Sequence, residues 1–485
     1  MLNDADIQAI IERVKGRVAA AEHADRSGPA LEAAAEIDMY RADLGDGIHA
    51  TVDAAVAAAR GAFVSYREMG LEVRKTIVEA MRAAMLREGE RLAYMAAEET
   101  GIGRAEDKVV KNRLVTTKTP GPEDLEPRAV TGDQGMLLTE YAPYGVIGSI
   151  TPTTNPTSTI INNSIAMVSA GNAATFNVHP NARRVSVENI KLLNHAITAA
   201  GGPSDLVTAI AKPTLDSAKE LMNHPDVRVL LVTGGPGVVR EALRTPKKAI
   251  TAGPGNPPAV VDPTGDIEQA GRDIVRGGSF DNNVVCIDEK TTIVVDTVAD
   301  RLVQSMQAAG AYRLKEHELK RLERVIFREK GPPNKPGVIN PEFIGKDASR
   351  ILSEIGVSVD RSVRLAVAEV PREHNLVWTE QMMPVMPVVR VKDVDTAIDL
   401  AVASEHGFRH TASIHSTNVA TITRMARAMN CSIFVANGPN FSGLGEGGEG
   451  FTSFSIASPT GEGLTNPRTF SRVRRVTVVG ALRIV

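Results

Sequence analysis

Cysteine is scarce in this sequence, since only Cys286 and Cys431 occur among its 485 residues. Two cysteines that lie far apart argue against a disulfide framework and favour a reducing compartment. The patterns C-x-x-C and H-E-x-x-H are both absent, so we expect no metal site of the kinds those motifs build. Each cysteine therefore has to be interpreted by itself, as a packing residue or as a nucleophile.

An excess of charge of either sign is also absent. The 55 Lys and Arg residues nearly balance the 58 Asp and Glu residues, and the formal net charge is −3. The interspersed charges form no basic patch that would bind nucleic acid or an anionic membrane. No apolar run reaches the roughly 18 residues that span a bilayer, and the N-terminus lacks the pattern of a secretory signal. We expect a cytoplasmic protein that binds neither nucleic acid nor membrane.

Aromatic residues are few, at 4%, whereas apolar residues as a whole make up 43% of the chain. That apolar content can fill the two or three cores expected for this length. Low aromatic content together with abundant Gly and Ala suits helices packed tightly on a sheet. The composition is therefore typical of a multidomain α/β enzyme.

The first residues predict an amphipathic helix, residues 1–20, that is separate from the main fold. Its apolar residues follow the i, i+3, i+4, i+7 spacing of one helix face and are Ile7, Ile10, Ile11, Val14 and Val18. Residues 21–44 are polar and aperiodic enough to form a linker. A short apolar-faced helix on a tether is suited to docking, and the alternative is a helix that packs on its own domain.

Apolar runs alternate with helical patterns from residue 144 onward. The first series of predicted strands covers 144–150, 173–178, 206–210 and 227–233. Strand, helix, strand at this spacing predicts a parallel sheet with right-handed crossovers. Ligands of such sheets bind at the carboxyl ends of the strands. Those ends are predicted at 151–155, 177–180 and 233–237.

A second series of predicted strands indicates another α/β domain, at 257–262, 291–296, 386–391 and 432–435. Cys286 lies on an irregular segment just before the strand 291–296. Loops held by a rigid sheet often carry catalytic side chains, whereas a packing cysteine more often falls inside an apolar run. Position alone leaves both interpretations of Cys286 open. Cys431 precedes a strand in an apolar context and is predicted to pack.

Three glycine-rich segments need separate interpretations. Residues 443–448 (GLGEGG) match G-x-G-x-x-G, but no strand runs into them and no helix follows, so we predict a turn beside the active site. Residues 233–237 (TGGPG) lie between a strand and a helix, where free N–H groups can face a phosphate or ribose. Residues 253–258 (GPGNPP) predict a rigid turn where two domains meet, or only a linker.

Three polar side chains are further candidates for the site. Asn155 follows a predicted strand, and its amide could stabilise an oxyanion or cap a helix. His179 and His410 could act in acid–base chemistry or bind a ribose, although a lone histidine is more often structural.

Seven segments in this order together resemble the aldehyde dehydrogenase superfamily, and within it the CoA-acylating propionaldehyde and acetaldehyde dehydrogenases of bacterial microcompartments. They are 151–156 (TPTTNP), 176–180 (FNVHP), 232–235 (VTGG), 252–257 (AGPGNP), 285–286 (VC), 380–385 (EQMMPV) and 443–450 (GLGEGGEG). The resemblance extends from about residue 45 to the end. It implies an α/β fold with two Rossmann-type domains and a small β oligomerisation arm, assembled as a dimer or tetramer. The implied parts are a cofactor-binding domain (45–126 and 147–251), a catalytic domain (252–454) and the arm (127–146 and 455–485).

The resemblance also implies a role for individual residues. It makes Cys286 the nucleophile, Asn155 the oxyanion-binding amide and Glu380 a contact to the nicotinamide ribose. His179 and Pro180 stand where hydrolytic relatives have the Lys-Pro pair that grips the adenosine ribose, and Thr154 replaces the usual Trp before the asparagine. The other implied cofactor-binding residues are Thr151, Pro152, Thr153, Asn177, Thr233, Gly234, Gly235, Ala252 and Gly253.

One departure from the family pattern bears on the reaction. Hydrolytic relatives carry a water-activating glutamate in a Glu-Leu-Gly-Gly pattern, where residues 251–254 read TAGP. Water needs a positioned base, whereas a thiol attacks a thioester well at neutral pH. The resemblance therefore implies NAD-dependent oxidation of a short-chain aldehyde, propionaldehyde first and acetaldehyde next, to acyl-CoA with coenzyme A as co-substrate. The alternatives are a hydrolytic aldehyde dehydrogenase, a cysteine-dependent CoA acyltransferase and an inactive scaffold protein.

The predicted N-terminal helix and linker resemble the encapsulation peptides that direct such enzymes into microcompartments. This resemblance implies microcompartment shell or core proteins as partners, beside further copies of the same chain, and a place in the cytoplasm inside a microcompartment.

Overall fold

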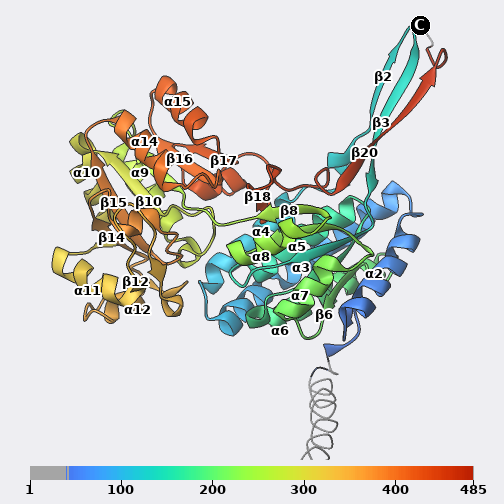
Figure 1. Cartoon of the computed structure of the whole chain (residues 1–485), viewed down its shortest axis with the longest axis horizontal. Coiled ribbons are helices and arrows are strands. Elements are labelled where there is room, and N and C mark those ends of the chain that lie inside the picture. The colour runs from blue at the N-terminus through green and yellow to red at the C-terminus, as the bar shows by residue number, and fades with distance from the viewer. Residues whose placement is uncertain (1–39, 41–42, 484–485) are drawn as a thin grey trace, which may run out of the picture.

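The computed structural model describes residue 40 and residues 43–483 (Figure 1). The predicted N-terminal helix, and most of the predicted linker, lie outside the described residues. In the described part, no helix is both long and apolar enough to cross a membrane.

The first sheet has six parallel strands in the order β1-β6-β5-β4-β7-β8. Its central strands are buried along their whole length, because helices cover both faces of a parallel sheet. The order runs outward from β4 in both directions, so β4 and β7 flank the switch point at which ligands bind such sheets. The strands are β1 (Ile48–His49), β4 (Val146–Ile150), β5 (Ala173–Asn177), β6 (Val207–Ile210), β7 (Val227–Thr233) and β8 (Lys248–Ala252).

The helices around the first sheet follow the predicted alternation with its strands. The long α3 and the helix after it, α4, precede β4, and four more helices alternate with the later strands. They are α2 (Val52–Tyr66), α3 (Leu71–Thr100), α4 (Ala105–Lys118), α5 (Pro156–Ser169), α6 (Arg183–Ala199), α7 (Leu215–Asn223) and α8 (Pro236–Arg244), with short 3-10 turns η2 (Pro122–Leu125) and η3 (Pro180–Ala182).

The second sheet has seven parallel strands in the order β11-β14-β15-β10-β9-β16-β17. β10 lies in its middle, so the segment with Cys286 leads into a central strand. The strands are β9 (Pro258–Val261), β10 (Thr291–Val295), β11 (Ala311–Arg313), β14 (Leu365–Glu369), β15 (Val385–Val391), β16 (Thr411–His415) and β17 (Ile433–Ala436).

Helices and short turns complete this half of the molecule, which Figure 1 shows beside the first sheet. The helices are α9 (Ile267–Gly278), α10 (Asp296–Ala308), α11 (Glu316–Ile326), α12 (Ala348–Ser353), α13 (Asn375–Trp378), α14 (Val394–Ser404) and α15 (Val419–Met429). The smaller elements are η4 (Phe280–Asn283), η5 (Pro341–Phe343), η6 (Asn440–Leu444) and the strand pair β12 (Phe327–Glu329) and β13 (Val338–Ile339).

The predicted α/β fold with two parallel sheets is confirmed, and all eight predicted strands are present within one or two residues. Strands β1, β8, β11, β14 and β16 were not predicted. β1 and β11 have only two and three residues, and β8 begins with an exposed lysine at a sheet edge. Short or edge strands carry little apolar pattern, which explains why these three were not predicted. β14 and β16 are buried interior strands of five residues, so neither reason applies to them. The residue boundaries proposed for the domains stay a prediction.

Three antiparallel strands form an arm that projects away from both sheets (Figure 1). β20 (Ser471–Val479) pairs with β3 (Gly135–Pro143) along its full length, and β2 (Arg128–Gly132) pairs with the other edge of β3. The short strands β18 (Ile456–Ala457) and β19 (Gly463–Leu464) precede the arm.

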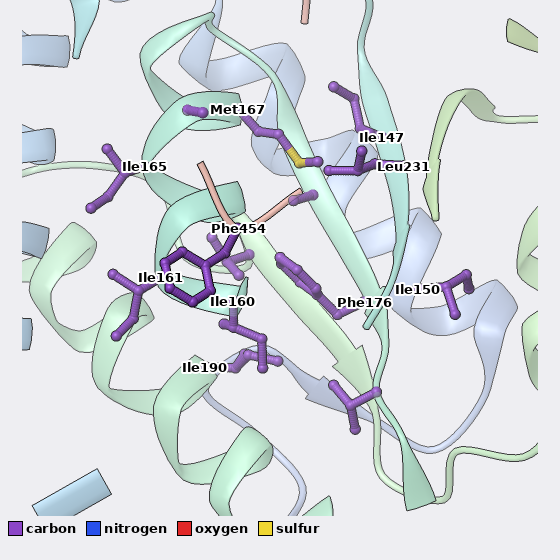
Figure 2. Close-up of a cluster of buried hydrophobic side chains, with 14 of the residues drawn as sticks. Ile147, Ile150, Ile160, Ile161, Ile165, Met167, Phe176, Ile190, Leu231 and Phe454 are labelled. Carbon is purple, nitrogen blue, oxygen red and sulfur yellow. The ribbon is translucent and has the colours of Figure 1, made fainter. Parts of the chain in front are cut away.

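The largest hydrophobic core joins segments from both halves. It holds the helices and strands of the first sheet together with Val285, Leu444 and Phe454. Figure 2 shows Phe454 among Ile160, Ile161 and other side chains of this core. The segments that flank Cys286 and follow the glycine-rich turn are therefore anchored on the first sheet, although they belong to the second half of the chain.

Candidate active site

A cavity of about 690 Å³ lies between the carboxyl ends of β4, β5 and β7 and the loop that carries Cys286. Every residue that the sequence analysis assigned to catalysis or cofactor binding lines it. These residues are Thr151, Pro152, Thr153, Asn155, Asn177, His179, Pro180, Thr233, Gly234, Gly235, Ala252, Gly253, Cys286 and Glu380. These residues lie together around one cavity, and the individual role of each stays a prediction. Apolar side chains that the sequence did not indicate, among them Leu215, Val284 and Phe454, complete the lining.

The loop before Cys286 has an unusual backbone. Asp281, Asn282 and Asn283 have φ values of 45°, 56° and 65°, three consecutive left-handed residues without a glycine. Such conformations cost on the order of 1–3 kcal/mol each and persist only where the surroundings fix them. The Asn282 amide donates to the Gly345 carbonyl at 2.9 Å, and the Asn283 amide donates to the Gly278 carbonyl at 2.8 Å. The loop is thus held in one shape.

Three consecutive charged residues behind Cys286 are completely buried. Lys290 Nζ donates to Asn283 Oδ1 at 2.7 Å and to the Val285 carbonyl at 3.2 Å. Asp288 accepts from the Val285 N–H at 3.0 Å, and Glu289 accepts from a backbone N–H of η6 at 2.8 Å. In the sequence this Asp-Glu-Lys run is indistinguishable from a solvated turn. In the structure it is the support of the nucleophile loop.

The Cys286 thiol is partly buried and meets opposing charges. Burial and, to a smaller extent, the Glu380 carboxylate raise the pKa of Cys286 to about 12, against the opposing effect of the Lys290 ammonium. Since the thiolate is the nucleophile, the resting thiol is protonated at neutral pH and has to lose its proton in the reaction. Cys431 differs, because its Sγ donates to the Ile433 carbonyl at 3.0 Å and it packs against the second core, as predicted.

Asn155 immediately precedes α5, but its side chain makes no capping hydrogen bond. Its Oδ1 instead accepts from Lys111 Nζ at 2.7 Å, and its Nδ2 donates to Thr154 Oγ1 at 3.1 Å. The helix-cap alternative is therefore wrong for this side chain. The amide is held at the cavity wall by a buried cation.

Glu380 is connected to the turn between the two sheets. Its Oε1 accepts from the Gly255 N–H at 3.3 Å, and Asn256 in the same turn donates to the carbonyls of Val377 and Ser404 at 3.0 and 2.7 Å. Residues 253–257 join β8 directly to β9, so this segment is a fixed connection rather than a loose linker.

The two candidate histidines occupy different environments. His179 lines the cavity, and its Nδ1 accepts from the Asn181 N–H at 3.1 Å, while burial lowers its pKa. His410 is fully buried and bonds to the Thr411 hydroxyl at 2.8 Å. Burial and the Lys290 charge lower the pKa of His410 to about 4, so its ring is neutral. It is not among the residues that line the cavity.

The predicted glycine-rich turn does lie beside the site, since Leu444 lines the cavity. Lys118 at the end of α4 donates to the Gly448 carbonyl at 3.1 Å and holds the turn. The sequence analysis missed the buried polar face of α4, Lys108, Lys111 and Asn112. The signal was present, because these residues share a helix face with Val115, which belongs to the core.

Comparison with known proteins agrees with this geometry. The sequence model described as "Aldehyde dehydrogenase family" matches residues 29–318 and 363–455. The chain belongs to the aldehyde dehydrogenase family. Among family members, an acetaldehyde dehydrogenase (acetylating) EutE from Salmonella typhimurium is 46% identical over 440 residues, which cover 90% of this chain and 94% of the relative. A propanal dehydrogenase (CoA-propanoylating) from Citrobacter freundii is 45% identical over 441 residues, 91% of this chain and 94% of the relative.

Solved structures of aldehyde dehydrogenases share the fold closely. A Rhodopseudomonas palustris propionaldehyde dehydrogenase with bound CoA and an acylated cysteine has a TM-score of 0.88 and 47% identity, and the match covers 91% of this chain and 100% of that one. A propionaldehyde dehydrogenase from the fucose utilisation microcompartment of Clostridium phytofermentans has a TM-score of 0.88 and 42% identity, with the same coverage.

Proposed function

We propose that this protein is an NAD-dependent, CoA-acylating aldehyde dehydrogenase, which converts a short-chain aldehyde to its acyl-CoA through a thioester on Cys286. Propionaldehyde is the first expected substrate and acetaldehyde the second. One observation carries the proposal: the nucleophile, an oxyanion-binding amide and a dinucleotide-type switch point meet in one cavity whose wall at residues 251–254 carries no carboxylate.

The cavity fits a nicotinamide dinucleotide. The hydroxyls of the cavity-lining residues Thr151 and Thr153 are buried without a hydrogen-bond partner among the described residues, and such groups call for a polar ligand. Gly234 and Gly235 lead into α8, where free N–H groups suit a phosphate. His179 and Pro180 would lie against the adenosine ribose, and Glu380 against the nicotinamide ribose. Bound NAD⁺ supplies the acceptor for the hydride that leaves the aldehyde carbon.

In the first half-reaction Cys286 Sγ attacks the aldehyde carbon and gives up its proton. The oxygen of the resulting thiohemiacetal is held by Asn155 Nδ2 and the Cys286 backbone N–H, each such donor being worth about 3 kcal/mol in the transition state. Loss of the hydride leaves an acyl thioester on Cys286.

In the second half-reaction the thiol of CoA attacks the thioester carbonyl, loses its proton, and releases the Cys286 thiolate, which is then reprotonated. Among the described residues that line the cavity, Glu380 is the only Asp or Glu. The segment that carries a water-activating glutamate in hydrolytic relatives contributes only Ala252, Gly253 and Pro254 to the wall. A thiol needs less help than water to cleave a thioester, so this wall favours CoA over hydrolysis.

The test is NADH formation from purified protein and propionaldehyde, with and without CoA, in parallel with NADP⁺ in place of NAD⁺. We expect steady turnover only when CoA is present. Steady turnover without CoA indicates the hydrolytic alternative, and CoA-dependent acyl transfer without any NADH indicates an acyltransferase. Cys286→Ala protein, assayed with NAD⁺ and with NADP⁺, is the negative control.

We expect copies of the chain to assemble into a dimer or tetramer through the arm. Its apolar side chains are open to solvent, with Val473 61% and Val479 79% exposed on β20 and Val130 51% exposed on β2. Exposed apolar strands of this kind favour association. Sedimentation of the full chain tests this, because deletion of residues 471–485 should yield a smaller species.

Association with a microcompartment rests on the predicted helix of residues 1–20, which lies outside the described residues. The named relatives include a dehydrogenase of a microcompartment. A chain without residues 1–20 should keep its activity and lose co-purification with shell or core proteins. Co-purification that persists would remove this part of the proposal.

A further inference from the structure

Helix α4 buries two lysines against a single carboxylate. Lys108 and Lys111 are each 1% exposed, and Asp281, at the start of the loop that leads to Cys286, is completely buried. Lysines are almost never buried so completely unless they are paired. Lys108 Nζ lies 2.9 Å from Asp281 Oδ2, and Lys111 Nζ contacts the same oxygen. Asp281 Oδ1 accepts the Arg104 N–H at 2.7 Å.

Lys111 has a second contact, which reaches the site. Its ammonium donates to Asn155 Oδ1 at 2.7 Å while it holds Asp281. An amide group is planar, so fixing its oxygen also fixes the direction in which Nδ2 points. A cation on the oxygen also polarises the amide and strengthens its N–H as a donor. Lys108 fixes the preceding backbone by donating to the Thr154 carbonyl at 3.3 Å.

The same carboxylate is tied to the nucleophile loop. Asp281 is the first of the three left-handed residues before Cys286, so its side chain helps to hold the strained backbone of that loop. Its backbone N–H also donates to Asp107 of α4 at 2.9 Å. The α4 face therefore contacts both the amide and the loop of the cysteine.

We propose that Lys111, held by Asp281, is a positioning residue that aims the Asn155 amide at the developing oxyanion and keeps it in register with the Cys286 loop. This inference rests on the proposed oxyanion role of Asn155. It assigns a function to a buried cation that touches neither the aldehyde nor the cofactor.

The experiment measures kcat and KM for propionaldehyde in Lys111→Met, Asn155→Ala and the double variant. Loss of one oxyanion donor lowers kcat by roughly 100- to 1,000-fold, and we expect Lys111→Met to lower it by about 10- to 100-fold with little change in KM. Because Lys111 acts through Asn155, the double variant should be no slower than Asn155→Ala alone. Lys111→Arg keeps a cationic donor and should recover part of the loss.

Arg113→Met is the matched control, because Arg113 is an exposed cation on the same helix. It should leave kcat within about two-fold of the unaltered enzyme, as surface substitutions usually do. Additive losses in the double variant, or a Lys111→Met enzyme as fast as the control, would overturn the inference. If Asn155→Ala loses activity and Lys111→Met does not, the proposed function stands and only this inference fails. If Asn155→Ala stays active, the proposed oxyanion role of Asn155 itself is wrong.

Lys111→Met leaves Asp281 with one partner fewer and can prevent folding. In that case the Lys111→Met/Asp281→Asn variant removes both charges together and is compared with Asp281→Asn. Lys111→Met/Asp281→Asn should have a lower kcat than Asp281→Asn. This difference should disappear when Asn155→Ala is added to both variants. If it persists without Asn155, Lys111 is only structural.

Discussion

The two sheets contribute to the cavity in different ways. The first sheet offers strand ends rich in Thr, Asn, Gly and Pro, which line the cavity with hardly any charge. The second offers a strained loop before β10, supported by the buried side chains Asp281, Asp288, Glu289 and Lys290. The topology of the sheet therefore shapes the cofactor side, whereas buried ionisable side chains hold the nucleophile side in place. Substitutions on the cofactor side should mainly change cofactor binding, whereas those on the nucleophile side should mainly change catalysis and stability.

The largest expected effect is on the nucleophile itself. Cys286→Ala removes the proposed nucleophile. Among the described residues that line the cavity, Met382 carries the one other sulfur. NADH formation should therefore be abolished, while circular dichroism should show an intact fold. Cys431→Ala is the control, since Cys431 packs away from the cavity, and it should retain activity. Activity retained in Cys286→Ala would end the assignment of the nucleophile.

The next effect concerns the support of the loop. Lys290→Met removes a buried ammonium that donates to three oxygens of the nucleophile loop, two on Asn283 and one on Val285. Leaving buried acceptors without their donor costs about 1–3 kcal/mol each, so the unfolding midpoint in urea should fall markedly. The exposed Lys320→Met is the control and should unfold as the unaltered protein does. An unchanged midpoint for Lys290→Met would contradict the view that buried charge holds this side.

These charges also mark the limit of prediction from the sequence. The parallel sheets follow from local apolar runs, and the rule that ligands bind at strand ends locates residues 151–155, 177–180 and 233–237. Other predicted cavity-lining residues, Glu380 among them, come from the resemblance to a family. The buried lysines of α4 depend on Asp281, which is 170 residues from Lys111 in the chain. The helix face that they share with Val115 indicates burial, but no local pattern reports such a distant partner. Likewise, Asp288, Glu289 and Lys290 look solvated until the tertiary fold encloses them.

A smaller effect tests the electrostatics at the cysteine. Because the Glu380 carboxylate raises the pKa of Cys286, Glu380→Gln should lower that pKa and speed alkylation of the thiol near neutral pH. The measurement is the iodoacetamide reaction rate of the protein without cofactor, followed from pH 6 to 10. At each pH below the pKa the rate follows the thiolate fraction, so Glu380→Gln should react faster than the unaltered protein, and an equal or slower rate would contradict the charge assignment.

The smallest effect is expected on the cofactor side. Thr153→Val removes the buried hydroxyl of a cavity-lining residue, which has no hydrogen-bond partner among the described residues. Loss of one such hydrogen bond costs about 0.5–1.5 kcal/mol, which raises KM for NAD⁺ by roughly two- to ten-fold. Stability and kcat should be almost unchanged. A large loss of stability would mean that this wall, too, depends on its polar side chains for folding.

The fate of the acyl group tests the central claim most directly. The protein is mixed with propionaldehyde and NAD⁺ without CoA, and its mass is measured intact and after digestion. We predict a propionyl group on the peptide that contains Cys286, which disappears on addition of CoA as propionyl-CoA forms in equal amount. Free propionate released without CoA, or no adduct on Cys286, would contradict the account.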